Sequence, residues 1–104
     1  MKAIFKKPNA KPEIINIVDE LSVFQNLVDG YIETVNLSYY DSRFTNTKIL
    51  AIVDEQGVLK DKEPNIMLNN GKTILVGNVV FISQKGDCFA SLTNKDINKI
   101  MEVF

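Results

Sequence analysis

The chain has 104 residues, of which 45% are hydrophobic and 24% are charged, and its formal net charge at pH 7 is −1. These values are ordinary for a folded protein of one domain, so we expect a single domain over residues 1–104. The near-neutral charge supplies no general basic surface for nucleic acid. The chain contains no histidine and one cysteine, Cys88, which excludes Ser-His-Asp triads, Cys-His dyads and the usual Cys/His zinc sites.

The apolar runs are short, and the longest of them, at 49–53 and 79–82, cannot span a bilayer. No apolar segment of the signal-peptide type follows the N-terminal lysines, so we expect a cytoplasmic protein. The five glycines are scattered and open no dinucleotide or phosphate-loop motif. We therefore expect no cofactor.

The N-terminal segment predicts a β-hairpin. Residues 2–7 and 13–18 are rich in β-branched and aromatic residues, and both predict strands. Between them, residues 8–12 hold two prolines around an asparagine, which is typical of a turn. Short turns join antiparallel neighbours, so the two strands are expected to pair.

A helix and a third strand are predicted next. Asp19 suits a helix N-cap, and the apolar residues of segment 20–28 fall at helical spacing. Gly30 stands where a left-handed residue commonly ends a helix. The alternating polar and apolar residues of Tyr31–Leu37 predict a strand.

The middle of the chain alternates between strand and irregular patterns. Residues 38–47 predict a loop, and the nearly all-apolar run 48–53 predicts a central strand covered on both faces. An acidic turn at 54–57 follows, and 58–60 is expected to continue in extended form. Residues 61–73 are polar and are expected to be irregular.

The C-terminal part predicts a hairpin and a helix. Residues 74–83 read as one long strand interrupted by Gly77, and a tight turn at 85–87 leads into a strand at 88–92. Thr93 is followed at the third helical position by Asp96, an imperfect capping box. Apolar residues at 97, 100, 101 and 104 fall at i, i+3, i+4 and i+7, so a short amphipathic C-terminal helix is predicted after Thr93.

The predicted element order is ββ-α-ββ-ββ-α, which indicates the α+β class. Short connections between strands imply a mostly antiparallel sheet of about five to six strands. Two short amphipathic helices are expected to cover it.

The run at 27–33, Leu-Val-Asp-Gly-Tyr-Ile-Glu, resembles the valine-x-glycine-aromatic-isoleucine-glutamate element of an uncharacterised small-domain family carried by phages, plasmids and low-GC bacteria. The acidic turn with glycine at 54–57, the pair Pro64-Asn65 and the strand opening at 76–80 resemble further elements of that family. The resemblance extends over residues 13–92. It implies no assigned activity, and the family's distribution implies an accessory role, such as helping a phage or plasmid to cope with its host.

Three carboxylates are candidates for chemistry. Glu33 lies on the polar face of its predicted strand, and Asp54 and Glu55 end the strand that follows along the chain. If these strands pair, the carboxylates could converge and hold a divalent cation or act as an acid–base pair. The alternative is structural: Glu33 as a cross-strand partner for a lysine, and Asp54 as a turn former.

The stretch 38–44 has the composition of a recognition loop. It joins Tyr39 and Tyr40 to the only arginine, Arg43, and then to Phe44. A tyrosine ring can stack on a base, and an arginine can hold a phosphate or a carboxylate. The alternative is that these aromatic side chains pack onto the core or onto the C-terminal helix.

Asn65 follows Pro64 in the polar segment and offers both a hydrogen-bond donor and an acceptor. Its amide could bind a ligand, or it could satisfy the backbone of the loop.

The sequence therefore predicts a non-enzymatic binding protein, a homo-oligomer with an accessory role. Its expected partner is a host or phage protein, or a small nucleotide-like ligand bound by Tyr39, Tyr40 and Arg43. One alternative is a small metal-dependent enzyme that uses Glu33, Asp54 and Glu55.

The other alternative is a nucleic-acid-binding regulator. It would require the N-terminal lysines at positions 2, 6, 7 and 11 to share a face with Lys48 or Lys60. Otherwise these lysines form a solvated strand face that discourages pairing with other chains.

Overall fold

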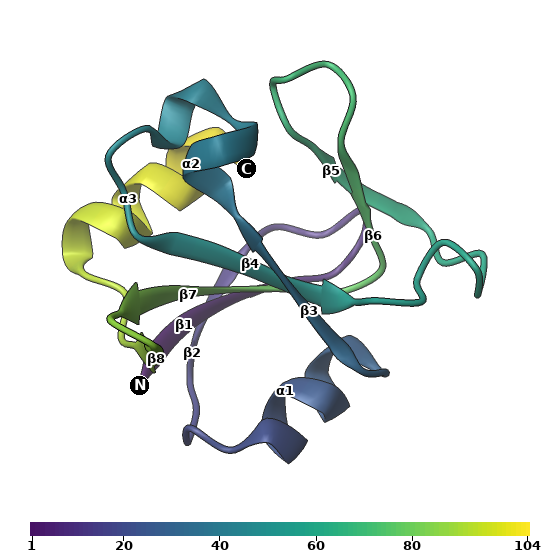
Figure 1. Cartoon of the computed structure of the whole chain (residues 1–104), viewed down its shortest axis with the longest axis horizontal. Helices are drawn as coiled ribbons and strands as arrows, with labels where there is room; N and C mark the ends of the chain where they lie inside the picture. The colour runs from purple at the N-terminus through teal and green to yellow at the C-terminus, as the bar shows by residue number, and fades with distance from the viewer.

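The computed structural model describes residues 1–104 and contains eight strands in two antiparallel sheets, together with short helices (Figure 1). In chain order the elements are β1 Lys2–Lys6, β2 Glu13–Asn16, α1 Leu21–Val28, β3 Ile32–Asn36, α2 Leu37–Tyr40, the 3-10 helix η1 Ser42–Phe44, β4 Ile49–Asp54, β5 Pro64–Met67, β6 Ile74–Val76, β7 Val79–Lys85, β8 Cys88–Ala90 and α3 Asn94–Val103. None of the helices is long and apolar enough to cross a membrane.

The larger sheet has the strand order β2-β1-β7-β4-β3, and β8 pairs with the far end of β7. Every pairing in it is antiparallel, as expected from the short connections. β4 lies between β7 and β3, and all six of its residues are buried. The prediction of a central strand covered on both faces is therefore confirmed, as is the α+β class with a mostly antiparallel sheet.

One face of this sheet packs against α1, which lies alone on that side in Figure 1. Phe24 and Val28 are its buried residues, because they share one stripe of the helix. They meet the side chains that alternate strand positions direct to this face. The strand residues of this core are Ala3, Phe5, Leu50, Ile52, Val80 and Ile82.

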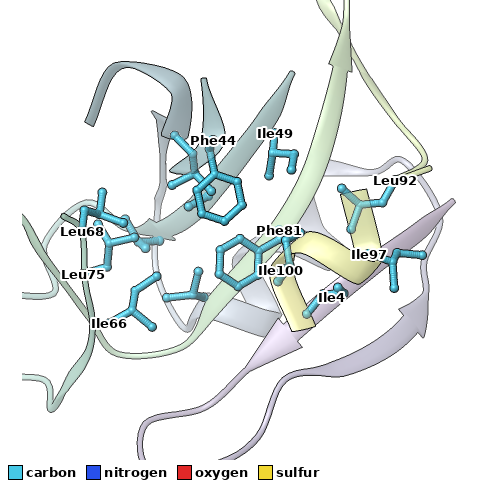
Figure 2. Packing of buried hydrophobic residues seen from close by; sticks show 14 residues of the cluster. Ile4, Phe44, Ile49, Ile66, Leu68, Leu75, Phe81, Leu92, Ile97 and Ile100 are labelled. Carbon is cyan, nitrogen blue, oxygen red and sulfur yellow. The ribbon is translucent and has the colours of Figure 1, made fainter. Parts of the chain in front are cut away.

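The opposite face carries the larger core, shown in Figure 2. It is covered by α2, η1 and α3 and by the small β5–β6 sheet. Phe44, Phe81 and Phe104 form a stack within it, with ring centroids 5.5 and 5.4 Å apart. The C-terminal helix is thereby held over the middle of the sheet, and the protein has three layers.

Two segments differ from the conformation predicted for them. Residues 38–47 were expected to form a loop, but they contain parts of α2 and η1. Asn36 and Asp41 start these short helices, because each side chain accepts a hydrogen bond from a backbone N–H two residues later. Residues 58–60, expected to be extended, lie in turns closed by the bonds Lys60 N to Gln56 O and Lys62 N to Gly57 O.

The long strand expected at 74–83 is two strands, β6 and β7, in different sheets. Gly77 separates them with a φ of 71°, a left-handed conformation that glycine adopts without steric cost. Its N–H donates to the carbonyl of Glu63. This turn allows β6 to pair with β5, which lies within the segment 61–73 that was expected to be irregular.

The helix ends differ from the predictions in two places. Glu20, and not Asp19, occupies the N-cap of α1, and it makes no side-chain capping bond. The left-handed residue at the end of α1 is Asp29, with a φ of 57°, and not Gly30. The capping box of Thr93 with Asp96 at the start of α3 is complete, with both reciprocal hydrogen bonds present.

Glycine is needed at position 30 because a larger side chain would collide with a neighbouring residue. A β-carbon built on Gly30 would lie 2.6 Å from Oδ2 of Asp54 and closer still to Oδ1. Asp54 is the last residue of β4 and is 4% exposed. The buried carboxylate occupies the volume that any larger side chain at position 30 would need.

We predict that Gly30→Ala lowers the free energy of unfolding by about 2–4 kcal/mol, because the methyl group must displace a buried, paired carboxylate. In an Asp54→Ala background the same substitution should cost less than about 1 kcal/mol. Urea unfolding of the four proteins of this double-mutant cycle measures the difference. An equal cost in both backgrounds would contradict the steric explanation.

Candidate ligand-binding site

The Asp41 carboxylate organises the loop that was predicted to serve recognition. Asp41 is 1% exposed and accepts hydrogen bonds from the N–H, Nε and Nη2 of Arg43 and from the N–H of Asn69. Burial acts to raise the pKa of this carboxyl, but the hydrogen bonds from Arg43 and Asn69 outweigh it and hold the pKa below its usual range. The loop is thereby fixed to the β5–β6 hairpin.

The three aromatic side chains of the loop have different fates. Tyr39 is 82% exposed and Tyr40 is 42% exposed, so both rings are accessible to a partner. Phe44 is fully buried, and its ring stacks on Phe104 in the core. The expectation that Phe44 contacts a ligand is therefore corrected, because its side chain is part of the packing that holds α3.

Beside this loop lies a polar groove of about 930 Å³, which we call the lysine groove. Its walls are the segment 43–48 and α3, and Ser83 of β7 also lines it. No apolar residue contributes to the lining. The lining residues are Arg43, Thr45, Asn46, Thr47, Lys48, Ser83, Thr93, Lys95, Asp96, Asn98, Lys99 and Glu102.

The charges of the lysine groove are incompletely balanced. All ion pairs of the protein involve Arg43, Lys60 or Lys62, so Lys48, Lys95 and Lys99 have no carboxylate within 4.0 Å. Of the two acids in the lining, Asp96 accepts the N–H of Thr93 in the capping box. The remaining acid, Glu102, lines the groove together with three lysines that have no ion-pair partner.

Arg43 connects this groove to the core. Its guanidinium binds Asp41 through Nη2 at 2.6 Å and lies 5.6 Å from the centre of the Phe104 ring. The hydrogen bond to Asp41 raises the pKa of Arg43, so this group keeps its charge. Arg43 is thus held at the edge of the groove by contacts on two sides.

A second buried carboxylate, Asp54, lies on the opposite side of the sheet, beside the end of α1. Lys60 Nζ and Lys62 Nζ both lie 2.8 Å from Asp54 Oδ2. The same two ammonium groups donate to the carbonyl of Asp29, and Lys62 also donates to that of Val28. We call this cluster the Asp54 clamp; it satisfies carbonyl groups that the end of a helix leaves without partners.

The predicted carboxylate site does not form. β3 and β4 do pair, but the register places Glu33 opposite Val53 and Ile32 opposite Asp54. Successive side chains point to opposite faces of a sheet, so Glu33 and Asp54 lie on different faces. No group of three acidic or other metal-ligating side chains exists in the structure, and the oxygens of Asp54 are bound by lysines. The alternative in which Glu33, Asp54 and Glu55 converge is therefore not realised, and Asp54 has a structural role.

The amide of Asn65 is fully used within the chain. Its Nδ2 donates to the carbonyls of Lys6 and Gly77, and its Oδ1 accepts from Lys6 Nζ at 2.6 Å. These bonds leave no free donor on Asn65 for a ligand, and the expectation of ligand binding is corrected to a structural role. Burial lowers the pKa of Lys6, which is 7% exposed.

The shared lysine face that the nucleic-acid-binding alternative requires is also incomplete. Lys6 points into the protein, and Lys60 is bound to Asp54. Three lysines do line one groove. Lys48 directly precedes β4, and Lys95 and Lys99 belong to α3. The sequence held one signal for them, since Lys95 and Lys99 are four residues apart on a predicted helix and so share a face.

The fold and these features define the class: a three-layer α+β domain with a polar, lysine-lined groove. A family model described as "Domain of unknown function (DUF3846)" matches residues 1–104. The chain belongs to this family, which confirms the resemblance to an uncharacterised small-domain family. No curated protein and no solved structure matches the chain significantly.

The Asp54 clamp should make the free energy of unfolding depend on pH in the acid range. Burial acts to raise the pKa of Asp54, but the bonds from Lys60, Lys62 and Gln56 N–H lower it to about 2. A carboxyl whose pKa is lower in the folded state stabilises the fold above its unfolded pKa, and this contribution is lost as pH falls toward the folded value. We predict that the unfolding free energy of the wild type loses about 2 kcal/mol more than that of Asp54→Asn between neutral pH and pH of about 2.

Urea unfolding at a series of pH values measures this difference. Asp87→Asn controls for the loss of one negative charge, because Asp87 is exposed and has no ion-pair partner. Parallel pH profiles for wild type and Asp54→Asn would show that the clamp does not hold the carboxylate charged.

Proposed function

We propose that this protein is a binding protein rather than an enzyme, and that the lysine groove holds a small phosphate-bearing ligand. The observation that carries this proposal is the set of three ammonium groups, on Lys48, Lys95 and Lys99, that line one groove without ion-pair partners. Phosphate groups match such a site because each oxygen can accept a charge-assisted hydrogen bond.

The side chains that line the groove favour a ligand with several polar groups. Threonine, asparagine and serine side chains supply neutral hydrogen-bond donors between the cations, and no apolar residue is present. Arg43 adds a planar guanidinium that Asp41 and Phe104 already hold in place. A pre-positioned side chain loses less conformational entropy on binding.

The nucleotide-like ligand predicted from Arg43 fits this proposal in its phosphate portion. Tyr39 and Tyr40 do not line the groove, and their exposed rings remain candidates for contact with a protein partner. The accessory role in a phage or another mobile element is a further part of the proposal, supported by the resemblance to the family and by nothing in the geometry.

The chemistry of the groove also supports binding over catalysis. It contains no histidine or cysteine, and its acids are Asp96, bound in the capping box, and the exposed Glu102. These residues provide cations and hydrogen-bond donors but no activated nucleophile.

The test is calorimetric titration with inorganic pyrophosphate and with adenosine triphosphate, using the wild type and the double variant Lys95→Ala/Lys99→Ala. Each charge-assisted hydrogen bond contributes about 1.5–3 kcal/mol, so the double variant should bind at least about tenfold more weakly. The matched control is Lys7→Ala/Lys72→Ala, which removes the same charge from exposed positions outside the groove.

Affinity that falls in the groove variant and is unchanged in the control supports the proposal. Equal losses in both variants would show unspecific attraction to positive charge. Absence of binding to either probe at millimolar concentration would overturn the proposed ligand class.

A further inference from the structure

The outer edge of the larger sheet at β3 is open. β3 has β4 as its one neighbour, and no other strand continues the sheet beyond it. Tyr31, directly before the strand, is 66% exposed, and Glu33 and Thr34 within it are exposed. An open edge presents unpaired backbone N–H and C=O groups, which are a template for another extended chain.

The hydrogen-bond pattern identifies which backbone groups are unpaired. The register of β3 with β4 continues to Tyr31 opposite Glu55, and Glu55 N donates to Tyr31 O at 2.8 Å. Bonded and non-bonded pairs alternate along an antiparallel ladder. Glu33 and Val35 therefore bond to β4, whereas the N–H and C=O groups of Ile32 and Thr34 and the N–H of Asn36 point away from it. The C=O of Asn36 belongs to the first turn of α2.

The outward groups are centred on Thr34, which offers both its N–H and its C=O. If a second copy of β3 lies antiparallel with Thr34 opposite Thr34 of the copy, Ile32 falls opposite Asn36. Each Thr34 N–H then meets the Thr34 C=O of the other copy, and each Asn36 N–H meets the Ile32 C=O. The side chains also fit this register. Glu33 falls opposite Val35 and not opposite its own copy, so no like charges stand directly across the interface, and a Thr–Thr pair occupies the centre.

The opposite edge of the larger sheet, at β2, has features that discourage pairing. β2 has four residues, follows Pro12 directly, and is preceded by Lys11. Short length, proline and lysine are the usual means of preventing edge pairing. β3 has five residues, Ile-Glu-Thr-Val-Asn, with no proline, glycine or lysine, and its register with β4 contains no bulge.

We propose that two copies of this chain form a dimer through antiparallel pairing of their β3 strands, with the two-fold axis at Thr34. The larger sheets of the two copies join into one continuous sheet, and the α1 layers lie on the same face of it. The interface is isologous, so each copy uses the same residues and the assembly closes at two. The lysine groove is formed by other elements and does not take part.

The first measurement is mass in solution by sedimentation velocity, from micromolar to millimolar concentration, for the wild type and three variants. Thr34→Pro removes the outward N–H and leaves the bonds to β4, because proline is tolerated at an edge position whose N–H faces outward. Thr34→Lys places two like charges opposite each other on the two-fold axis. Glu33→Lys also introduces a lysine into β3, but opposite Val35, and serves as the control.

The expected result is a wild-type dimer, a Glu33→Lys dimer, and dissociation constants at least about tenfold higher for both Thr34 variants. Circular dichroism of each variant verifies that it is folded. Amide hydrogen exchange by NMR tests the register in the wild type itself. The amides of Thr34 and Asn36 should exchange more slowly as concentration rises, while those of Glu33 and Val35 are protected at every concentration.

A wild type that stays monomeric at millimolar concentration would overturn the proposal. So would a dimer in which the Thr34 and Asn36 amides stay unprotected, since the contact would then lie elsewhere. Protection of these amides by a foreign peptide, without any self-association, would assign the open edge to a different partner and would also overturn it.

Discussion

The buried carboxylate of Asp54 is the constraint on which much of the architecture depends. A charged group taken out of water is costly unless it is paired and hydrogen-bonded. Asp54 meets this requirement with two lysine ammonium groups and a backbone N–H. The two lysines also bind carbonyls at the end of α1. The end of the helix, the end of β4 and the following turn are thereby fixed as one unit.

Asp41 plays a corresponding role on the other side of the sheet. Its carboxylate binds Arg43 and the hairpin residue Asn69, and it thereby holds η1 against the β5–β6 sheet. Arg43 then lies close to the Phe104 ring at the end of α3. The position of α3 relative to segment 43–48 is the geometry that creates the lysine groove, so this groove depends on a buried acid as well.

The two surfaces proposed for function use different parts of the fold. The groove is built on the face covered by α3 and is lined by side chains, which suits a ligand recognised through its charges. The edge at β3 offers backbone groups, which recognise any extended chain and gain selectivity from register and neighbouring side chains. A dimer joined at β3 leaves the groove of each copy to bind its own ligand.

The sequence by itself determined the elements whose signals are local. The apolar run of β4 predicted a central strand, the spacing around Phe24 and Ile97 predicted the helices, and Thr93 with Asp96 predicted a capped helix start. Each of these follows from periodicity or from a hydrogen bond within one turn of the chain. The family was also identifiable at this level, because its elements are short motifs in order.

Only the tertiary structure decided what the polar residues do. Asp54 was a candidate for metal binding, but the register with β3 separates it from Glu33, and Lys60 and Lys62 after the following turn bind it. Asn65 became structural through bonds to Lys6, 59 residues away in sequence. Lys48 lies near Lys95 and Lys99 because α3 packs on the face of the sheet to which Ile49, the first residue of β4, contributes. The contacts of Asn65 and of Lys48 join segments far apart in the chain, and the bonds of Asp54 depend on how the following turn folds back. Periodicity and composition encode neither.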